Sequence, residues 1–244
     1  MKTTTISLTV LALVCCATAE TVQVKVTQDT WVGPQNAETV LQNSSPNALR
    51  VATPDNLRAR IYYRRALFGF DLSAINSKSV SSVTFTATTS KGIDASYNNG
   101  TTLRAYLISN AISDRFLQST TSEKSLIAAD FFEDGYILDH PLAGVVIGDY
   151  TTSGSASEQT INFRFSAEAI ADFKTDSNNF ATIIIENRTG NNAGFRNPTA
   201  ANDGLAFQSL ETPGGTPAVL TVTQGPVESD PVLLSVGGIT IGLK

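Results

Sequence analysis

ATIII, at residues 181–185, is the segment of this sequence that decides its fold class. Three consecutive isoleucines favour extended backbone, and polar turn-forming asparagines stand on both sides, at Asn179 and Asn187. The run is too short for a typical helix and does not alternate with polar residues. We therefore predict a central strand that is buried on both faces of a β-sheet.

Other strands are predicted on both sides of this run because apolar and polar residues alternate with a period of two. Residues 66–70 and 205–207 also have the apolar composition of buried strands. Many short strands separated by Gly, Asn, Asp and Pro predict an all-β domain, and specifically a two-sheet antiparallel β-sandwich of the jelly-roll kind. The remaining predicted strands lie at residues 22–26, 49–51, 80–88, 103–107, 161–165 and 218–222.

One or two short helices complete the predicted domain. Ser166 stands where a capping residue is expected, and Ile170 and Phe173 recur with helical spacing behind it. Residues 121–132 form the second candidate, with Leu126, Ile127 and Phe131 as its apolar positions. Neither segment is long enough to form a helical layer.

The first 19 residues have the pattern of a secretory signal peptide. Lys2 precedes an apolar run at residues 6–14, and Ala17-Thr18-Ala19 is a small-residue cleavage site. The run is too short to span a bilayer. We therefore predict a signal peptide at 1–19, a β-sandwich domain at 20–223, and a secreted, extracellular or cell-surface location.

Residues 224–244 differ in composition from the predicted domain. A polar spacer flanked by Pro226 and Pro231 precedes an apolar, glycine-containing stretch that ends at Leu243. Three interpretations remain open for this tail: an extra edge strand, a disordered end, or the remnant of a surface-sorting signal. The stretch is too short to cross a membrane as a helix.

Charge and cysteine content exclude several functional classes. The chain has a net charge of −5, and its densest basic group, at Arg58, Arg60, Arg64 and Arg65, is interrupted by apolar residues. No nucleic-acid partner is therefore expected. The two cysteines, Cys15–Cys16, both lie in the predicted signal peptide, so the usual cysteine-containing zinc sites cannot form in the domain.

The sequence also lacks a recognisable catalytic constellation. A serine-histidine-aspartate triad would have to use His140, the single histidine, and no serine stands in the glycine-flanked elbow of α/β-hydrolases. Glu133 and Asp134 form the most suggestive acidic pair for glycoside chemistry, but adjacent residues of a strand point to opposite faces. We therefore predict that the protein is not an enzyme.

Several segments together resemble the DNRLRE-type domain, an extracellular β-sandwich family counted among carbohydrate-binding modules. The most specific block is RRALFGFDLSAI at residues 64–75, an arginine-containing approach to a Phe-Asp-Leu-Ser motif. The segments QDTWV at 28–32, SPNALRV at 45–51 and PAVLTV at 217–222 follow the same family pattern. The resemblance covers most of residues 21–223 and implies a polysaccharide ligand.

Sugar binding requires flat aromatic rings and polar groups beside them. Tyr62-Tyr63 is the best candidate pair, because one residue of an adjacent pair in a strand faces away from the core. The flanking Arg60 and Arg64 could bind a uronate carboxylate through paired hydrogen bonds. Trp31 is the remaining candidate ligand residue. No cofactor is expected apart from a structural calcium ion, with Asp29, Asp71 and Asp203 as candidate ligands.

Three functional hypotheses follow from these observations. The first is a non-catalytic, secreted or cell-surface polysaccharide-binding module, with an acidic and a neutral polysaccharide both left open as its ligand. The second is a structural surface or matrix protein that self-assembles through its sheet edges, with the tail as an added strand. The third is a polysaccharide lyase or hydrolase whose catalytic groups come from distant strands.

Overall fold

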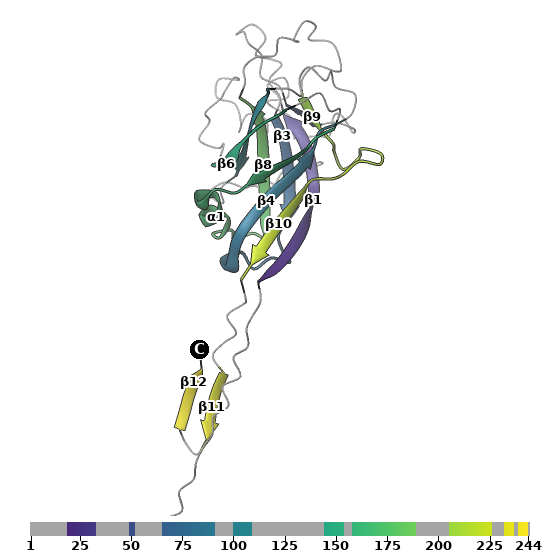
Figure 1. Ribbon diagram of the computed structural model, residues 1–244. Coiled ribbons are helices and arrows are strands. Elements are labelled where there is room, and N and C mark those ends of the chain that lie inside the picture. The colour runs from purple at the N-terminus through teal and green to yellow at the C-terminus, as the bar shows by residue number, and fades with distance from the viewer. Residues whose placement is uncertain are drawn as a thin grey trace, which may run out of the picture.

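The computed structural model describes residues 19–32, 49–51, 65–90, 100–108, 144–153, 158–188, 205–225, 232–236 and 239–243. Within these ranges, eight strands form one antiparallel sheet in the order β6-β5-β8-β3-β1-β10-β4-β7 (Figure 1). The strands are β1 (Glu20–Val32), β3 (Arg65–Asp71), β4 (Val80–Thr88), β5 (Thr102–Leu107), β6 (Val145–Thr151), β7 (Thr160–Arg164), β8 (Phe180–Asn187) and β10 (Val219–Gln224).

Strand β1 connects the two halves of this sheet. Its first half pairs with β10, and its second half pairs with β3. The register shifts between Val26 and Gln28, so that Thr27 is an extra residue in β1, and its hydroxyl bonds to the carbonyl of Gly69. A bulge of this kind bends a strand and increases its twist. Strand β1 belongs to both halves of the sheet: the four-stranded half is β1-β10-β4-β7, and the five-stranded half is β6-β5-β8-β3-β1. The bulge therefore lies where β1 passes from the four-stranded half to the five-stranded half.

Aromatic side chains from both halves meet in the core. The ring centroids of Phe68 on β3 and Phe85 on β4 are 5.2 Å apart, and the ring centroid of Phe70 lies 6.0 Å from that of Phe85. Phe163 stacks on Phe85 from β7. Phe68 and Phe85 are fully buried. The two halves of the sheet therefore face each other across one apolar core, which confirms the predicted all-β antiparallel class.

The face of β3 and β8 that points away from this core is buried as well. All eight residues of β8 are buried, including Thr182 and Ile184, which alternate with the core-facing isoleucines. On β3, Leu67 is also fully buried. The prediction of a central strand at 181–185 with both faces buried is confirmed.

The free edges of the sheet lie against each other. The backbone N–H of Ser166 donates to the carbonyl of Ile147 on β6, and the Ser166 hydroxyl donates to the carbonyl of Val146. The same hydroxyl oxygen accepts the N–H of Ala169 and so caps helix α1 (Ala167–Phe173), as predicted. One serine thus begins the helix and joins the β7 side of the sheet to β6.

Short elements surround the sheet. Strands β2 (Leu49–Val51) and β9 (Leu205–Phe207) pair with each other, and Phe207 packs 6.0 Å from Phe68. A 3₁₀ turn, Ser77–Ser79, precedes β4. In the tail, β11 (Val232–Val236) and β12 (Ile239–Leu243) pair with each other across a two-residue connection. Among the strands that the structure describes, this ribbon joins no other sheet, so the tail is not an edge strand of the domain sheet.

The remaining predictions concern the other strands, the second helix and the signal peptide. The strands predicted at 22–26, 49–51, 66–70, 80–88, 103–107 and 205–207 lie within β1, β2, β3, β4, β5 and β9. Those predicted at 161–165 and 218–222 coincide with β7 and β10 except for Phe165 and Ala218, each of which lies one residue outside its strand. Strand β6 was not predicted. The candidate helix at 121–132 and the signal peptide lie outside the described residues. No helix of the described segments is long and apolar enough to cross a membrane.

Candidate functional site

A row of alternating charge crosses four strands on the outward face of the five-stranded half. The register places Arg104 on β5 opposite Asp149 on β6 and, on its other side, opposite Glu186 on β8. Arg65 on β3 follows beyond Glu186, beside the pair formed by Ala66 and Ile185. Directly opposite residues on neighbouring strands have Cβ atoms about 5 Å apart. We call Asp149, Arg104, Glu186 and Arg65 the charged row.

The charged row changes from exposed to buried along its length. The side chains of Asp149 and Arg104 are 46% and 30% exposed, whereas those of Glu186 and Arg65 are 3% and 4% exposed. The outer pair has two parallel hydrogen bonds, from Arg104 Nε to Asp149 Oδ1 at 2.6 Å and from Nη2 to Oδ2 at 2.8 Å. The inner pair joins Arg65 Nη2 to Glu186 Oε2 at 2.9 Å. Only the outer end can meet a ligand without disturbing buried charge.

Glu186 connects the charged row to two further side chains. Its Oε1 accepts the hydroxyl of Tyr106, which is nearly buried on β5. The same oxygen accepts a hydrogen bond of 3.1 Å from Arg188 Nη1, whose side chain is 31% exposed. A buried carboxylate with three donors satisfies the requirement that buried charges be paired. Glu186 therefore fixes the position of Arg188 at the surface.

Electrostatic effects show that these groups act on one another. Burial, together with the hydrogen bond to Glu186, raises the pKa of Tyr106 to about 12, and Arg188 and Arg104 partly oppose that rise. The hydrogen bond from Arg104 holds the pKa of Asp149 below its ordinary value, with a smaller contribution from Arg188. Tyr106 therefore remains a neutral phenol, and Asp149 remains ionised, throughout the neutral range.

Two hydroxyls continue this surface at the next position along the strands. Thr102 pairs with Thr151, and their hydroxyl oxygens are 3.1 Å apart. The backbone N–H of Arg188 donates to the Thr102 carbonyl at 2.7 Å, which holds Arg188 beside this pair. We call the charged row together with Tyr106, Arg188, Thr102 and Thr151 the cluster. Its exposed end offers guanidinium groups, which can bind carboxylates, and a carboxylate and hydroxyls, which can form hydrogen bonds with sugar hydroxyls.

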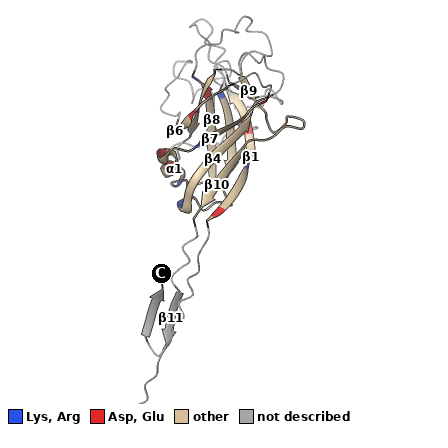
Figure 2. Ribbon diagram, viewed as in Figure 1, with Lys and Arg blue, Asp and Glu red and all other residues tan. Residues whose placement is uncertain are grey.

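The cluster carries positive charge in an acidic protein. Arg65, Arg104 and Arg188 contribute three positive charges against two negative charges from Asp149 and Glu186, which leaves a formal +1, whereas the whole chain has −5. Figure 2 shows tan along β4 and β10, which have no charged residues. The strands of the five-stranded half also carry Asp29 and Asp71, so the positive charge that could attract an anion belongs to the cluster itself.

Most of the predicted ligand residues lie outside the described part of the chain. Arg60, Tyr62, Tyr63 and Arg64 belong to this group, so their role stays a prediction. Trp31 is described: it pairs with the core residue Ala66 and is half-buried on the inner face of β1.

Tyr150 also lies on the inner side of the sheet. Its ring is 6.1 Å from that of Phe163, and it packs against the apolar core. Core packing therefore accounts for Tyr150.

The structure separates two of the three candidate calcium ligands. Asp29 is 1% exposed, lies on the inner face of β1 and accepts the N–H of Leu210 at 2.7 Å. Asp71 is exposed at the end of β3 and accepts the N–H of Ser73. Because they occupy opposite faces of the sheet, these two carboxylates do not share a site. Asp203 lies outside the described residues, within which no group of three or more acidic, His or Cys residues could hold a metal ion.

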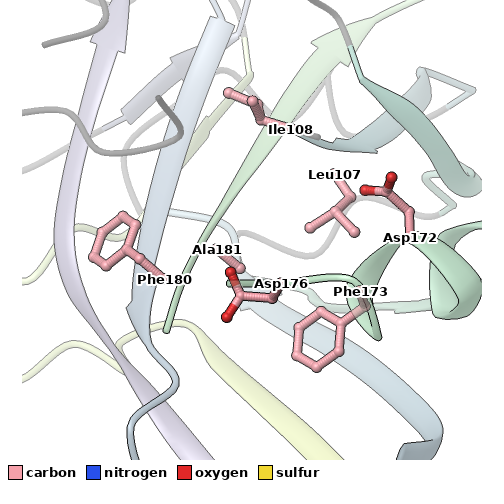
Figure 3. Close-up of a pocket in the computed structure, with 7 residues that line it drawn as sticks. All are labelled: Leu107, Ile108, Asp172, Phe173, Asp176, Phe180 and Ala181. Carbon is pink, nitrogen blue, oxygen red and sulfur yellow. The ribbon is translucent and has the colours of Figure 1, made fainter. Parts of the chain in front are cut away.

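A small hollow between α1 and the ends of β5 and β8 is too small for a sugar. Figure 3 shows mostly apolar walls, with the carboxylates of Asp172 and Asp176 on the helix side. The hollow has a volume of about 10 Å³, which is enough for about one water molecule. The lining residues are Leu107, Ile108, Asp172, Phe173, Asp176, Phe180 and Ala181.

The charged row cannot be recognised from the sequence alone. Asp149 lies on the strand that was not predicted, and Glu186 directly follows the isoleucine run. Arg104 alternates with Leu103 and Ala105, so its outward position could be expected, but its partners could not. Register between strands that are far apart in the sequence is the missing information.

Comparisons with known proteins give no family and no function. No protein-family model matches the chain, and no curated protein matches it. Among solved structures, 88% of the chain is similar to 14% of dimeric latent PorU from Porphyromonas gingivalis, at 9% identity and a TM-score of 0.33. A latent aurone synthase, a polyphenol oxidase, matches 80% of this chain over 33% of its own, at 12% identity and a TM-score of 0.33. The chain therefore spans only a minor part of each protein, and likenesses this distant carry no argument.

Proposed function

We propose that the protein is a non-catalytic polysaccharide-binding domain whose ligand carries carboxylate groups and binds at the exposed end of the charged row. One observation carries the proposal: Arg104, Asp149 and Arg188 stand together at the surface beside the hydroxyls of Thr102 and Thr151. A guanidinium matches a carboxylate through paired hydrogen bonds, and hydroxyls match the rest of a sugar ring. The signal peptide predicted at residues 1–19 and the sequence resemblance to the DNRLRE-type domain are consistent with the same function.

The chemistry of the cluster favours binding over catalysis. A lyase or hydrolase needs a group that exchanges a proton near neutral pH. Tyr106 is nearly buried, donates to Glu186 and has a pKa of about 12, which is far from that range. Asp149 and Glu186 are both held by arginines. The groups of the cluster that can hold an anion in place are therefore its exposed arginines, Arg104 and Arg188.

Replacing Arg104 with glutamine is expected to weaken binding of an acidic polysaccharide by about tenfold or more, which is the scale of a lost hydrogen bond between charged groups. Binding of polygalacturonate and of a neutral glucan can be measured by titration calorimetry at fixed ionic strength. Melting temperatures of both proteins would verify that the variant is folded.

Lys25→Gln is the matched control, because Lys25 is exposed on β1 in the four-stranded half and its loss changes the net charge equally. We expect this variant to bind as the parent protein does. Failure of the folded parent protein to bind any acidic polysaccharide would contradict the proposed function, and equal losses from both substitutions would place the ligand elsewhere.

Self-assembly is the second candidate, and the self-paired ribbon of β11 and β12 favours it. The sheet edges favour it less, because Ser166 holds β6 against the β7 side. Size-exclusion chromatography of the domain with and without residues 225–244 separates the candidates. A binding domain is expected to elute as a monomer in both forms, whereas a tail-dependent oligomer would support assembly.

A further inference from the structure

The outer ion pair occupies the binding face of Arg104. Asp149 takes both the Nε and the Nη2 hydrogens of the guanidinium, at 2.6 and 2.8 Å. Two parallel N–H donors of this kind match the two oxygens of a planar carboxylate. A ligand carboxylate that approached Arg104 in the same geometry would therefore meet Asp149 already in its place.

Exposure makes this contact exchangeable. The Asp149 side chain is 46% exposed and that of Arg104 is 30% exposed, so water can replace part of this contact when the pair separates, which it cannot do for a buried pair. The partner of Arg188 is different, because Glu186 is 3% exposed and also accepts from Arg65 and Tyr106. Of the two arginines at the exposed end of the cluster, Arg104 is thus the one whose carboxylate can be displaced at lower cost.

We propose that Asp149 is a built-in competitor, a carboxylate of the protein that occupies Arg104 until a ligand carboxylate replaces it. The inference rests on the proposed function and adds how that site is regulated. Asp149 sets a threshold: a single weak anion does not displace it, whereas a chain that presents several carboxylates and hydroxyls at once does. Its negative charge also repels an arriving anion, so it opposes binding in two ways.

Asp149→Asn tests the inference, because it removes the charge and keeps the size of the side chain. We expect the variant to bind polygalacturonate at least about fivefold more tightly than the parent protein. Asp71→Asn is the matched control, since it makes the same change in net charge at an exposed site on the far end of β3. That control is expected to change the affinity less than twofold.

The double variant Arg104→Lys with Asp149→Asn shows whether the gain acts through Arg104. A lysine lacks the planar fork, so the double variant is expected to lose most of the gain. Circular dichroism melting verifies that each variant is folded, and Asp149→Ser serves if the asparagine variant is not.

The outcomes separate the inference from the proposed function. If the parent protein binds and Asp149→Asn binds equally or more weakly, the competitor role is wrong and the binding function stands. If neither protein binds, both proposals are wrong. A gain equalled by Asp71→Asn would show a general effect of net charge, and the competitor role would then be wrong as well.

Discussion

Glu186→Ala is expected to lower the free energy of unfolding by about 3–5 kcal/mol, the cost of removing one partner from a buried ion pair. The substitution leaves Arg65, whose side chain is 4% exposed, without its carboxylate. It also removes the acceptor of the Tyr106 hydroxyl and one partner of Arg188. Urea unfolding followed by far-ultraviolet circular dichroism gives the free energy directly.

Two further variants show whether buried charge is the cause. Tyr106→Phe removes one donor and leaves the ion pair, so it should cost only about 1 kcal/mol. Replacing the pair with apolar residues of similar size, Arg65→Met with Glu186→Leu, should recover a large part of the lost stability. A loss below about 1 kcal/mol for Glu186→Ala would show that the charged row does not stabilise the fold.

Asp29→Asn is expected to be more stable than the parent protein at pH 8 by about 2–4 kcal/mol, with a much smaller difference near pH 4. Burial raises the pKa of Asp29 to about 7; the N–H of Leu210 lowers it in part, and Glu211 adds to the rise. Between pH 4 and 7 the folded chain therefore holds a proton that the unfolded chain has lost. The stability from this group is present below about pH 4 and is lost as the pH rises through 7.

The comparison requires stability curves of both proteins from pH 4 to 8, because other carboxylates also titrate in that range. The difference between the two curves isolates Asp29. Asp71→Asn, an equal charge change at an exposed site, should give a nearly constant offset. Parallel curves for Asp29→Asn and the parent protein would show that Asp29 titrates normally in the fold.

Local pattern was enough to predict most strands and the helix. The alternation at residues 103–107 and 161–165 marks β5 and β7, and Ser166 begins α1 where its capping side chain predicted. These elements are set by residues within a few positions of one another. Strand β6 was missed because apolar and polar residues do not alternate in its sequence, VVIGDYT: three apolar residues stand in a row, and the turn-forming residues Gly148 and Asp149 follow them.

The candidate site could not be predicted in the same way. Arg104 and Asp149 are 45 residues apart, and the register of β5 against β6 joins them. Glu186 receives donors from β3 and β5, which are neighbours of β8 in the sheet and distant in sequence. Each residue by itself looks like an ordinary polar position of a strand. The alternating charge exists only once four strands are placed side by side.

By itself, the sequence determined that residues 22–26 form a strand, because Val22, Val24 and Val26 alternate with polar residues. Continued alternation would have turned Asp29 toward solvent, where a metal ligand is expected. Only the tertiary structure decided otherwise: the extra residue Thr27 in β1 reverses the alternation after Val26. Asp29 and Trp31 therefore face the interior, since a one-residue shift moves every later side chain to the opposite face of a strand.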